Sequence, residues 1–281
     1  MVDRTKRVGY CGMSTDIYVA RAALHMWEEP PISGTNGSGT IFFSGCSMNC
    51  VFCQNAKISH GRDGKKISEE RLVEIMLELQ GKGAHNINLV TGTHYIPTLC
   101  TAIDSARDQG LKIPIVYNTS SYENVEALRM LDGRVNVYLP DFKFYTEKTA
   151  RALASAPNYF EVADAAIEEM TDQTGWPIFD RFGNLVNGTV VRVLLLPGRV
   201  AEAKLIVKHL FQKYNDKIHI SLMRQYTPMP GMPRPLNRKV THEEYRQLVD
   251  YACRLGIEFG FVQSAKSAME NYIPDFNGEG V

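Results

Sequence analysis

The chain has 281 residues, of which 44% are hydrophobic and 22% are charged, as in ordinary soluble globular proteins. It carries 31 basic and 31 acidic residues, so its net charge is near zero, which argues against nucleic acid as its main partner. No stretch of about 18 apolar residues is present, so we expect no membrane span. The polar first ten residues lack the apolar core of a signal peptide, so we expect a cytoplasmic protein whose cysteines remain free thiols.

From residue 40 onward, short apolar runs of β type alternate with amphipathic helical patterns. Ser68 is the expected N-cap of the first of these helices, and Gly183-Asn184 is the expected turn of a hairpin. A proline-rich loop is expected over 227–238. The patterns predict strands at 40–44, 86–90, 113–117, 135–139, 190–196, 218–222 and near 259–261. They predict helices at 68–80, 97–109, 123–131, 146–154, 159–173, 200–214 and 242–255.

This alternation predicts parallel βαβ units, and six units are too few to close an eight-stranded barrel. No GxGxxG segment opens a helix after the first strand, so a dinucleotide-binding fold is unsupported. We therefore expect an α/β fold, a partial (β/α)6 TIM-like barrel that is open on one side. Residues 1–39 would form a short N-terminal extension packed on the barrel, and residues 40–281 the barrel itself. Active residues would lie at the C-terminal ends of the strands.

Three cysteines, Cys46, Cys50 and Cys53, follow the first predicted strand with the spacing C-x3-C-x2-C. Thiolates are soft ligands that suit zinc, copper(I) or iron–sulfur clusters. A [4Fe–4S] cluster normally takes four cysteines, so three would leave one iron open to bind and activate another molecule. Two alternatives remain: a structural Cys3His zinc site completed by His60, or three ordinary buried cysteines.

The segment Ser44–Asn55, with aromatic Phe52 before the third cysteine, resembles the cluster loop of the radical S-adenosylmethionine superfamily. Together with the segments 22–34 and 89–97, it is similar to pyruvate formate-lyase activating enzyme and its uncharacterised homologues. The resemblance implies a [4Fe–4S] cluster on the three cysteines and S-adenosyl-L-methionine bound at the open iron. It also implies a flavodoxin or ferredoxin-like electron donor and reductive cleavage of the cofactor to a 5′-deoxyadenosyl radical.

The resemblance further implies a set of cofactor-contacting positions on successive strand ends, with no catalytic residue beyond the cluster and the cofactor. Two of these positions depart from the activating enzymes: His94 stands in place of an acid, and Tyr226 in place of a histidine. The implied contacts are Phe52, Gln54, Gly92, Thr93, His94, Asn118, Ser120, Asp141, Lys143, Arg192 and Tyr226.

These positions suit a zwitterionic ligand, because Arg192 offers a planar fork to a carboxylate and Asn118 offers a donor and an acceptor. Structural alternatives remain open. Arg192 could pair with Asp141, and Asp141 could instead bridge to Lys143. His94 could be a solvated loop residue, and the segment 27–29 could simply pack the N-terminus over the barrel.

The resemblance leaves three functional hypotheses. In the first, the enzyme activates a partner protein by removing hydrogen from a backbone glycine, with the loop 227–238 beside the barrel opening. In the second, the same radical chemistry acts on a small molecule or a peptide. In the third, the chain is a non-catalytic metal or iron–sulfur binding module.

Overall fold

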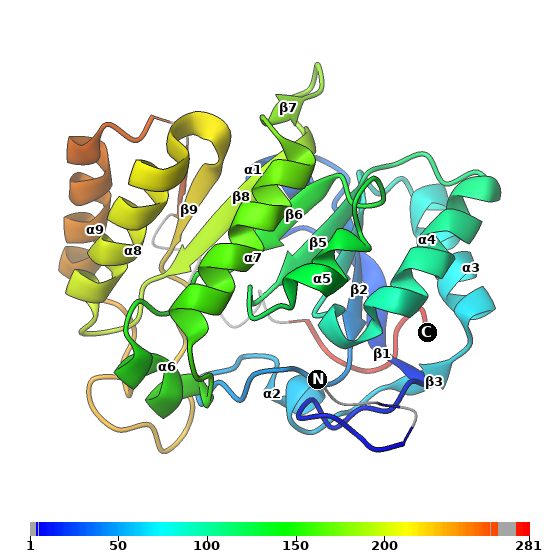
Figure 1. The fold of residues 1–281 in the computed structure, drawn as a ribbon, viewed down its shortest axis with the longest axis horizontal. Helices are drawn as coiled ribbons and strands as arrows, with labels where there is room; N and C mark the ends of the chain where they lie inside the picture. The colour runs from blue at the N-terminus through cyan, green and yellow to red at the C-terminus, as the bar shows by residue number, and fades with distance from the viewer. Residues whose placement is uncertain (1–3, 5, 259, 264–273) are drawn as a thin grey trace.

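The computed structural model describes residues 4, 6–258, 260–263 and 274–281, and these residues form one curved sheet with helices around it (Figure 1). The strand order along the sheet is β10-β9-β8-β6-β5-β4-β2-β1-β3, and β7 pairs only with β8. The strands are β1 (Ile17–His25), β2 (Ser38–Phe43), β3 (Lys65–Ile67), β4 (Ile87–Val90), β5 (Ile115–Thr119), β6 (Val137–Pro140), β7 (Ile178–Phe179), β8 (Leu185–Leu194), β9 (His219–Met223) and β10 (Gly260–Val262).

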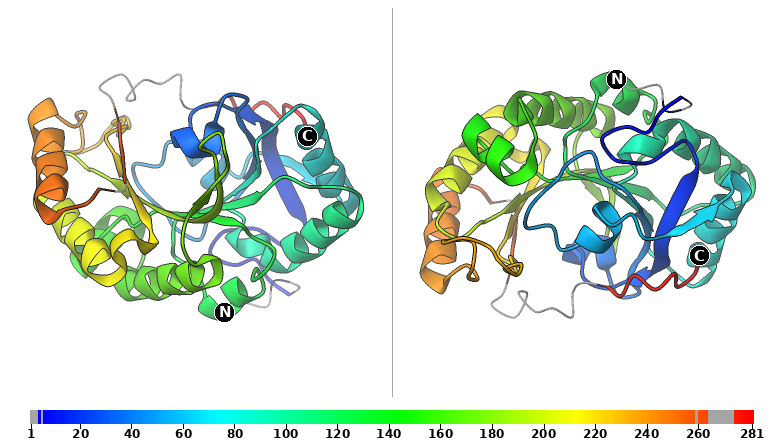
Figure 2. Two further views of the ribbon diagram at one scale, coloured as in Figure 1. Left: turned by 90° about the horizontal axis from the view of Figure 1, so that it is seen from above. Right: turned by 90° about the horizontal axis from the view of Figure 1, so that it is seen from below.

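The part of the sheet that runs from β2 to β10 is entirely parallel, as the βαβ pattern predicts. Its two end strands, β10 and β3, are not paired with each other, so the described sheet is a partial TIM-like barrel that does not close. The end-on views of Figure 2 show the longer helices on the outer side of this curved sheet. Residue 259, the first of the expected last strand, lies outside the described residues, and β10 forms from the next three.

Two strands were not expected from the sequence. β1 pairs antiparallel with β2 from Val19↔Phe43 to His25↔Ser38, and β3 pairs antiparallel with the start of β1. The C-terminal residues continue this edge: the Ala22 amide donates to the Glu279 carbonyl at 2.9 Å, and Arg21 forms an ion pair with Glu279. Part of the segment 1–39 is therefore integral to the sheet.

The helices agree with the predicted ones to within about two residues, except that α5 is shorter at both ends. The side chain of Asn124 caps α5 by accepting from the Ala127 amide, so Glu123 lies outside the helix. Thr146 and Thr241 cap α6 and α9 in the same way, as Ser68 caps α3. The helices are α1 (Pro30–Ser33), α2 (Ala56–Ser59), α3 (Glu69–Gly81), α4 (Ile96–Asp108), α5 (Val125–Arg129), α6 (Glu147–Ala154), α7 (Tyr159–Thr174), α8 (Val200–Tyr214) and α9 (His242–Leu255), with 3-10 turns at Thr93–Tyr95 and Asn215–Lys217.

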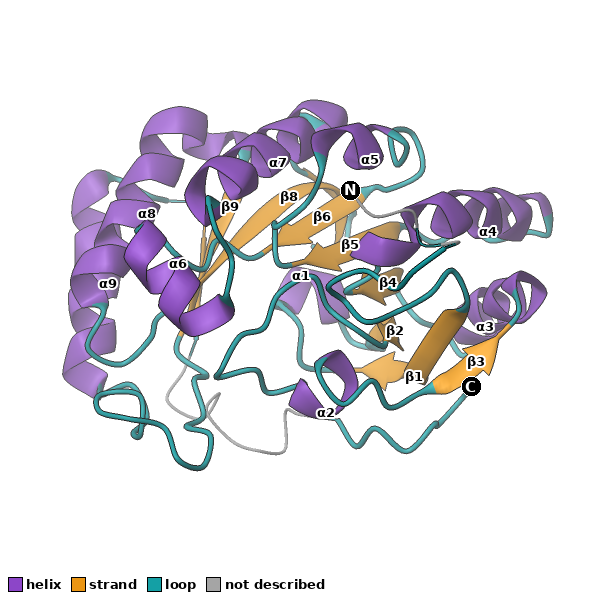
Figure 3. Cartoon of the chain, turned by 60° about the horizontal axis from the view of Figure 1, so that its bottom comes forward, coloured by secondary structure: helices purple, strands orange, loops and turns teal. Residues whose placement is uncertain are grey.

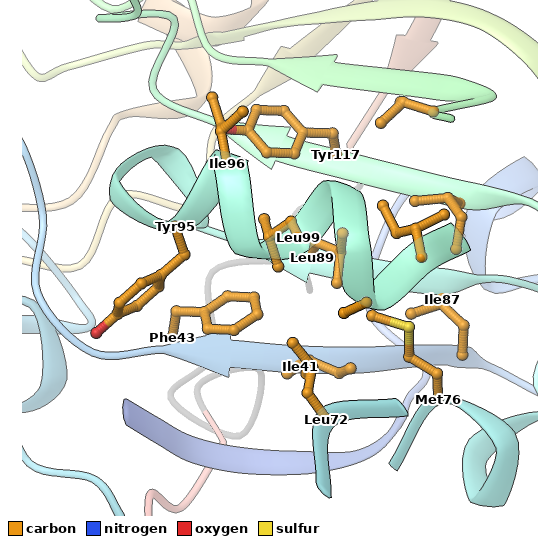
Figure 4. Close-up of a cluster of buried hydrophobic side chains, with 14 of the residues drawn as sticks. Ile41, Phe43, Leu72, Met76, Ile87, Leu89, Tyr95, Ile96, Leu99 and Tyr117 are labelled. Atoms are coloured by element: carbon orange, nitrogen blue, oxygen red, sulfur yellow. The ribbon is translucent and has the colours of Figure 1, made fainter. Parts of the chain in front are cut away.

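Alternate residues of each strand face the helices on the outside and the barrel interior on the inside. On the outside, Ile41 and Leu89 pack against Leu72 of α3 and Leu99 of α4 in one buried cluster (Figure 4). The interior instead receives polar side chains, which include Asn88, Asn118 and Arg192. No helix among the described residues is both long and apolar enough to span a lipid bilayer.

Candidate active site

The cysteine loop joins β2 to α2 at the C-terminal edge of the sheet. Figure 3 shows loops gathered at this edge, near α2 and α6. Gly45 opens the loop with φ 84°, and a Cβ there would lie 2.3 Å from the Met13 side chain. The Asn49 amide donates to the Ala154 carbonyl at 3.0 Å, and the Gly45 amide donates to the Ile58 carbonyl at 2.9 Å. Backbone hydrogen bonds at the start and in the middle of the loop thus fix its path.

All three cysteine thiols line one cavity of about 270 Å³. Burial raises the pKa of Cys46 to about 11 and that of Cys50 to about 12, and nearby Lys143 acts in the opposite direction on both. The Cys46 and Cys50 thiols are therefore protonated at neutral pH until a metal displaces the protons, as thiol metal sites require. Three soft donors on one cavity wall, with a cation beside them, suit an iron–sulfur cluster.

The same cavity collects most of the cofactor-contacting residues expected from the resemblance. Its wall includes Phe52, Gln54, Asn118, Ser120, Asp141, Lys143, Arg192 and Tyr226. They come from the cysteine loop, from the ends of β5, β6 and β8, and from the segment after β9, which are far apart in the sequence. Their roles toward a cofactor remain predictions.

Gly92, Thr93 and His94 do not line this cavity, because a 3-10 turn directs them elsewhere. The Thr93 hydroxyl donates to Glu123 at 2.7 Å, and His94 Nε2 lies 2.8 Å from the Ser44 carbonyl. The His94 ring is buried, so it is not a solvated loop residue, and burial lowers its pKa to about 4. Thr91 lines the cavity in their place.

A buried ionic network centred on Arg192 forms one side of the cavity. Arg192 donates from Nε to Asp141 at 2.7 Å, from Nη2 to Asn118 at 2.6 Å, and from Nη1 to Glu28 at 3.3 Å. Lys143 forms a second ion pair with Asp141. Burial alone would raise the pKa of Asp141, but the two cations outweigh it and hold that pKa below its usual value. Asp141 therefore pairs with both Arg192 and Lys143, so both of the structural pairings considered from the sequence are present.

Glu28 belongs to the site although the sequence indicated only a packing role for its segment. Its Oε1 accepts from Asn88 at 3.1 Å and from Asn118 at 3.3 Å, and its carboxylate lines the cavity. Burial raises the pKa of Glu28 and Arg192 opposes this. The site thus has an acid beside its arginine, which comes from the N-terminal segment rather than from a strand end.

The cysteine loop also contacts the segment after β9. The ring of Phe52 lies 6.2 Å from that of Tyr226, and Gln54 Nε2 donates to the Thr227 carbonyl at 3.4 Å. The Tyr226 hydroxyl donates to the Leu236 carbonyl at 2.6 Å, so this side chain offers its ring to the cavity while its hydroxyl is engaged in the proline-rich loop.

The remaining cysteines and His60 lie apart from the cavity wall. Cys11 and Cys100 are buried, and Cys253 is exposed. No group of three or more His, Cys, Asp or Glu side chains in the described part of the chain is arranged around a single metal ion. In a [4Fe–4S] cluster each cysteine binds a different iron, so its ligands need not converge on one point.

Fold and site together define an open α/β barrel with a three-cysteine loop and a buried ionic network at the C-terminal edge of its strands. The sequence model of the Radical SAM superfamily matches residues 40–202. The chain therefore belongs to the radical SAM superfamily, and this membership implies a [4Fe–4S] cluster and S-adenosylmethionine. The zinc interpretation is thereby superseded.

Individual proteins are similar to this chain in sequence or in fold. The chain is 27% identical over 265 residues to the uncharacterized protein MJ0674 of Methanocaldococcus jannaschii, covering 92% of this chain and 73% of that protein. It has the fold of the FeFe-hydrogenase maturase HydG from Carboxydothermus hydrogenoformans, with a TM-score of 0.56, 13% identity, and coverage of 84% and 55% of the two chains. For Streptococcus suis SuiB bound to S-adenosylmethionine, the TM-score is 0.53, the identity 11%, and the coverage 78% and 48%. The chain spans about half the length of these solved structures.

Proposed function

We propose that this chain is a radical S-adenosylmethionine enzyme that activates a partner protein by removing a hydrogen atom from a backbone glycine. Cys46, Cys50 and Cys53 would hold the [4Fe–4S] cluster. The observation that carries the proposal is that these thiols share one cavity with Arg192, Asp141 and Asn118. The glycine target is supported by the resemblance of the cluster loop to that of the glycyl-radical activating enzymes.

The bound cluster and cofactor would supply one-electron cleavage that generates a 5′-deoxyadenosyl radical. The chain's own residues would bind and orient the cofactor. Arg192 is placed to bind a carboxylate, and Asn118 and Glu28 offer polar groups on the same wall. Phe52, Tyr226 and Leu194 contribute apolar surface that excludes water from the reacting atoms.

The test is an anaerobic turnover assay. The protein is reconstituted with iron and sulfide, given S-adenosylmethionine and dithionite, and assayed for 5′-deoxyadenosine. Cys50→Ala should abolish the product and lower the bound iron, whereas Cys253→Ala, which removes an exposed thiol outside the cavity, should leave both unchanged. Absence of product from a protein with a full complement of iron would favour the non-catalytic binding module.

The target is tested with peptides that contain 2,2-dideuteroglycine. Deuterium recovered in 5′-deoxyadenosine would show abstraction from glycine. Turnover that leaves the product unlabelled, with these peptides present in excess, would favour the alternative in which a small molecule or another peptide position is the target.

A further inference from the structure

A second and larger hollow extends from the barrel interior toward the opposite end of the barrel, where the strands begin. It has a volume of about 1220 Å³ and is lined by residues of the segment 26–36, the β7–β8 hairpin, β9 and β10 with the residues that follow each, and by His85 and Arg192. Figure 1 shows α1 and β7 at the top of the molecule, far from α2 and α6 at the bottom. We call this hollow the lower groove, because it lies below the active-site cavity when the barrel is viewed with the C-terminal ends of its strands upward, which is opposite to the orientation of Figure 1.

The lower groove reaches the active-site cavity. The two hollows adjoin, because both are lined by the same five described residues: Trp27, Glu28, Arg192, Met223 and Gln225. A ligand in the lower groove would therefore lie against the same Glu28–Arg192 pair that forms the wall of the cofactor cavity.

The rim of the lower groove is unusually apolar for a surface. Phe182 is 74% exposed, Val262 63%, Trp27 52%, Met26 44% and Phe179 42%. Five of the exposed large hydrophobic side chains thus gather at one hollow. Contiguous exposed apolar surface of this kind marks a site of interaction.

One carboxylate in the lower groove has an oxygen without a hydrogen-bond partner, although Ser221 and Arg192 act on the same carboxylate. Glu29 is only 7% exposed, and its Oε2 accepts no hydrogen bond. The donors of Arg192 are directed to Asp141, Asn118 and Glu28 instead. Because an unsatisfied buried carboxylate oxygen is costly, a ligand that donates a hydrogen bond from a cation to Glu29 Oε2 would recover that cost.

The charge balance around Glu29 favours the same ligand. Three carboxylates, Asp141, Glu28 and Glu29, surround two cations, Arg192 and Lys143. One carboxylate is therefore left without its own cation. Burial raises the pKa of Glu29, and a bound ammonium or guanidinium group would favour its charged form.

The lower groove also exposes backbone groups that a peptide can pair with. β10 pairs with β9 from Gly260↔Ile220 to Val262↔Leu222, and its other edge has no partner strand among the described residues. An edge strand of this kind can accept an extended peptide as an additional strand. The groove volume also exceeds the roughly 300–1,000 Å³ typical of small-molecule sites.

We infer that the lower groove binds an extended peptide segment along β10 and receives a lysine or arginine side chain of that segment at Glu29. This deepens the proposed function and rests on it, because the peptide would be part of the protein that the enzyme acts on. Phe179 and Phe182 would cover the apolar part of the segment.

The experiment uses a pool of acetylated pentapeptides, randomised at every position, equilibrated with the anaerobically reconstituted protein. Mass spectrometry identifies the retained peptides. We expect about fivefold enrichment of lysine and arginine, corresponding to about 1 kcal/mol, together with enrichment of aromatic residues. Glu29→Gln should remove the basic enrichment and keep the aromatic one, whereas Phe182→Ala should do the reverse.

The controls separate this inference from other outcomes. Glu126→Gln, which removes an exposed carboxylate on α5, should leave the enrichment intact. Butylamine at the same concentration should not displace the peptides, and displacement would show a site for small amines instead. No basic enrichment in the wild-type protein would overturn the inference. Formation of 5′-deoxyadenosine is measured in parallel samples of the same protein preparation without peptide, so failure of the radical chemistry is seen independently of peptide binding.

Discussion

Arg192 of β8 and Glu28 of the segment after β1 form a buried ion pair, with Nη1 and Oε2 3.3 Å apart and both side chains about nine-tenths buried. The pair joins residues 164 positions apart in the chain and lies between the active-site cavity and the lower groove. It therefore couples the N-terminal segment to the parallel part of the sheet.

Removing the acid of this pair should destabilise the fold. Glu28→Ala leaves Arg192 with only Asp141 and Asn118, and we expect a loss of about 3 kcal/mol, the lower end of the range for breaking a buried pair. Urea unfolding measures the change. Glu74→Ala, which breaks an exposed pair with Arg71, should cost less than about 1 kcal/mol. Equal losses in the two variants would show that the Glu28 pair contributes no more than a surface pair.

Exchanging the guanidinium for an ammonium should weaken cofactor binding. Arg192 bonds to three different residues at once, and a single ammonium cannot span them while also meeting a carboxylate. For Arg192→Lys we expect the affinity for S-adenosylmethionine to fall about tenfold by calorimetry on the reconstituted protein. Arg199→Lys, whose partners Thr149 and Glu202 lie outside the cavity, is the matched control. An unchanged affinity in Arg192→Lys would exclude this arginine from cofactor binding.

Removing the hydroxyl of Tyr226, in contrast, should leave cofactor binding nearly unchanged. Its hydroxyl donates to the Leu236 carbonyl, so only its ring faces the cavity. Tyr226→Phe should therefore change the affinity for S-adenosylmethionine by less than about twofold, while the lost buried hydrogen bond lowers the free energy of unfolding by about 1–2 kcal/mol. A tenfold loss of affinity would mean that the hydroxyl turns toward the cofactor when it binds.

Glu123 makes stability depend on pH. Burial raises its pKa to about 7, although Thr119, Thr93 and Tyr117 all donate to its Oε1. Between pH 4.5 and pH 7 the folded protein keeps a proton on Glu123 that the unfolded chain releases, so the contribution of Glu123 to the free energy of unfolding falls as pH rises through this window. The loss amounts to about 3 kcal/mol.

Urea unfolding at pH 5 and pH 8 tests this effect. Buried His25 and His94, whose pKa values burial lowers to about 4, act in the opposite direction in every variant, so the test compares variants rather than the wild-type protein alone. From pH 5 to pH 8 the free energy of unfolding should change less favourably in the wild-type protein than in Glu123→Gln, by about 2–3 kcal/mol, because only the wild-type protein has the Glu123 dependence. Glu126→Gln, on the exposed face of α5, should retain it. If Glu123→Gln and the wild-type protein show the same pH dependence, another group is responsible.

The parallel part of the fold could be predicted because its signals are local. Apolar runs such as 86–90 mark buried strands, and Ser68 marks a helix start. β1 was missed because Ala20, Ala22 and Ala23 favour a helix, and only pairing with β2 makes the segment a strand. Here the pairing of β1 with β2 overrides the helix propensity of the segment, and no local sequence pattern reveals that pairing.

Some residues of the site could likewise be predicted from the sequence, and others could not. Arg192 and Asp141 follow from their positions on inward-facing strand ends, and the structure brings them within hydrogen-bonding distance. Glu28 could not be predicted as a cavity residue, since its place depends on how the segment after β1 folds back into the barrel. His94 was expected at the cavity by its position in the motif, but the turn at Thr93–Tyr95 directs its ring to the Ser44 carbonyl.

The hydrogen bond between the Ala22 amide and the Glu279 carbonyl links the two ends of the described chain at one edge of the sheet. That amide can exchange with deuterium only when residues 278–281 detach, since β2 covers the opposite side of β1. Its exchange rate is therefore set by a local detachment, which needs less free energy than unfolding of the barrel. Ala22 would thus exchange faster than buried amides of β5, and its rate would report how often the C-terminal residues leave the edge.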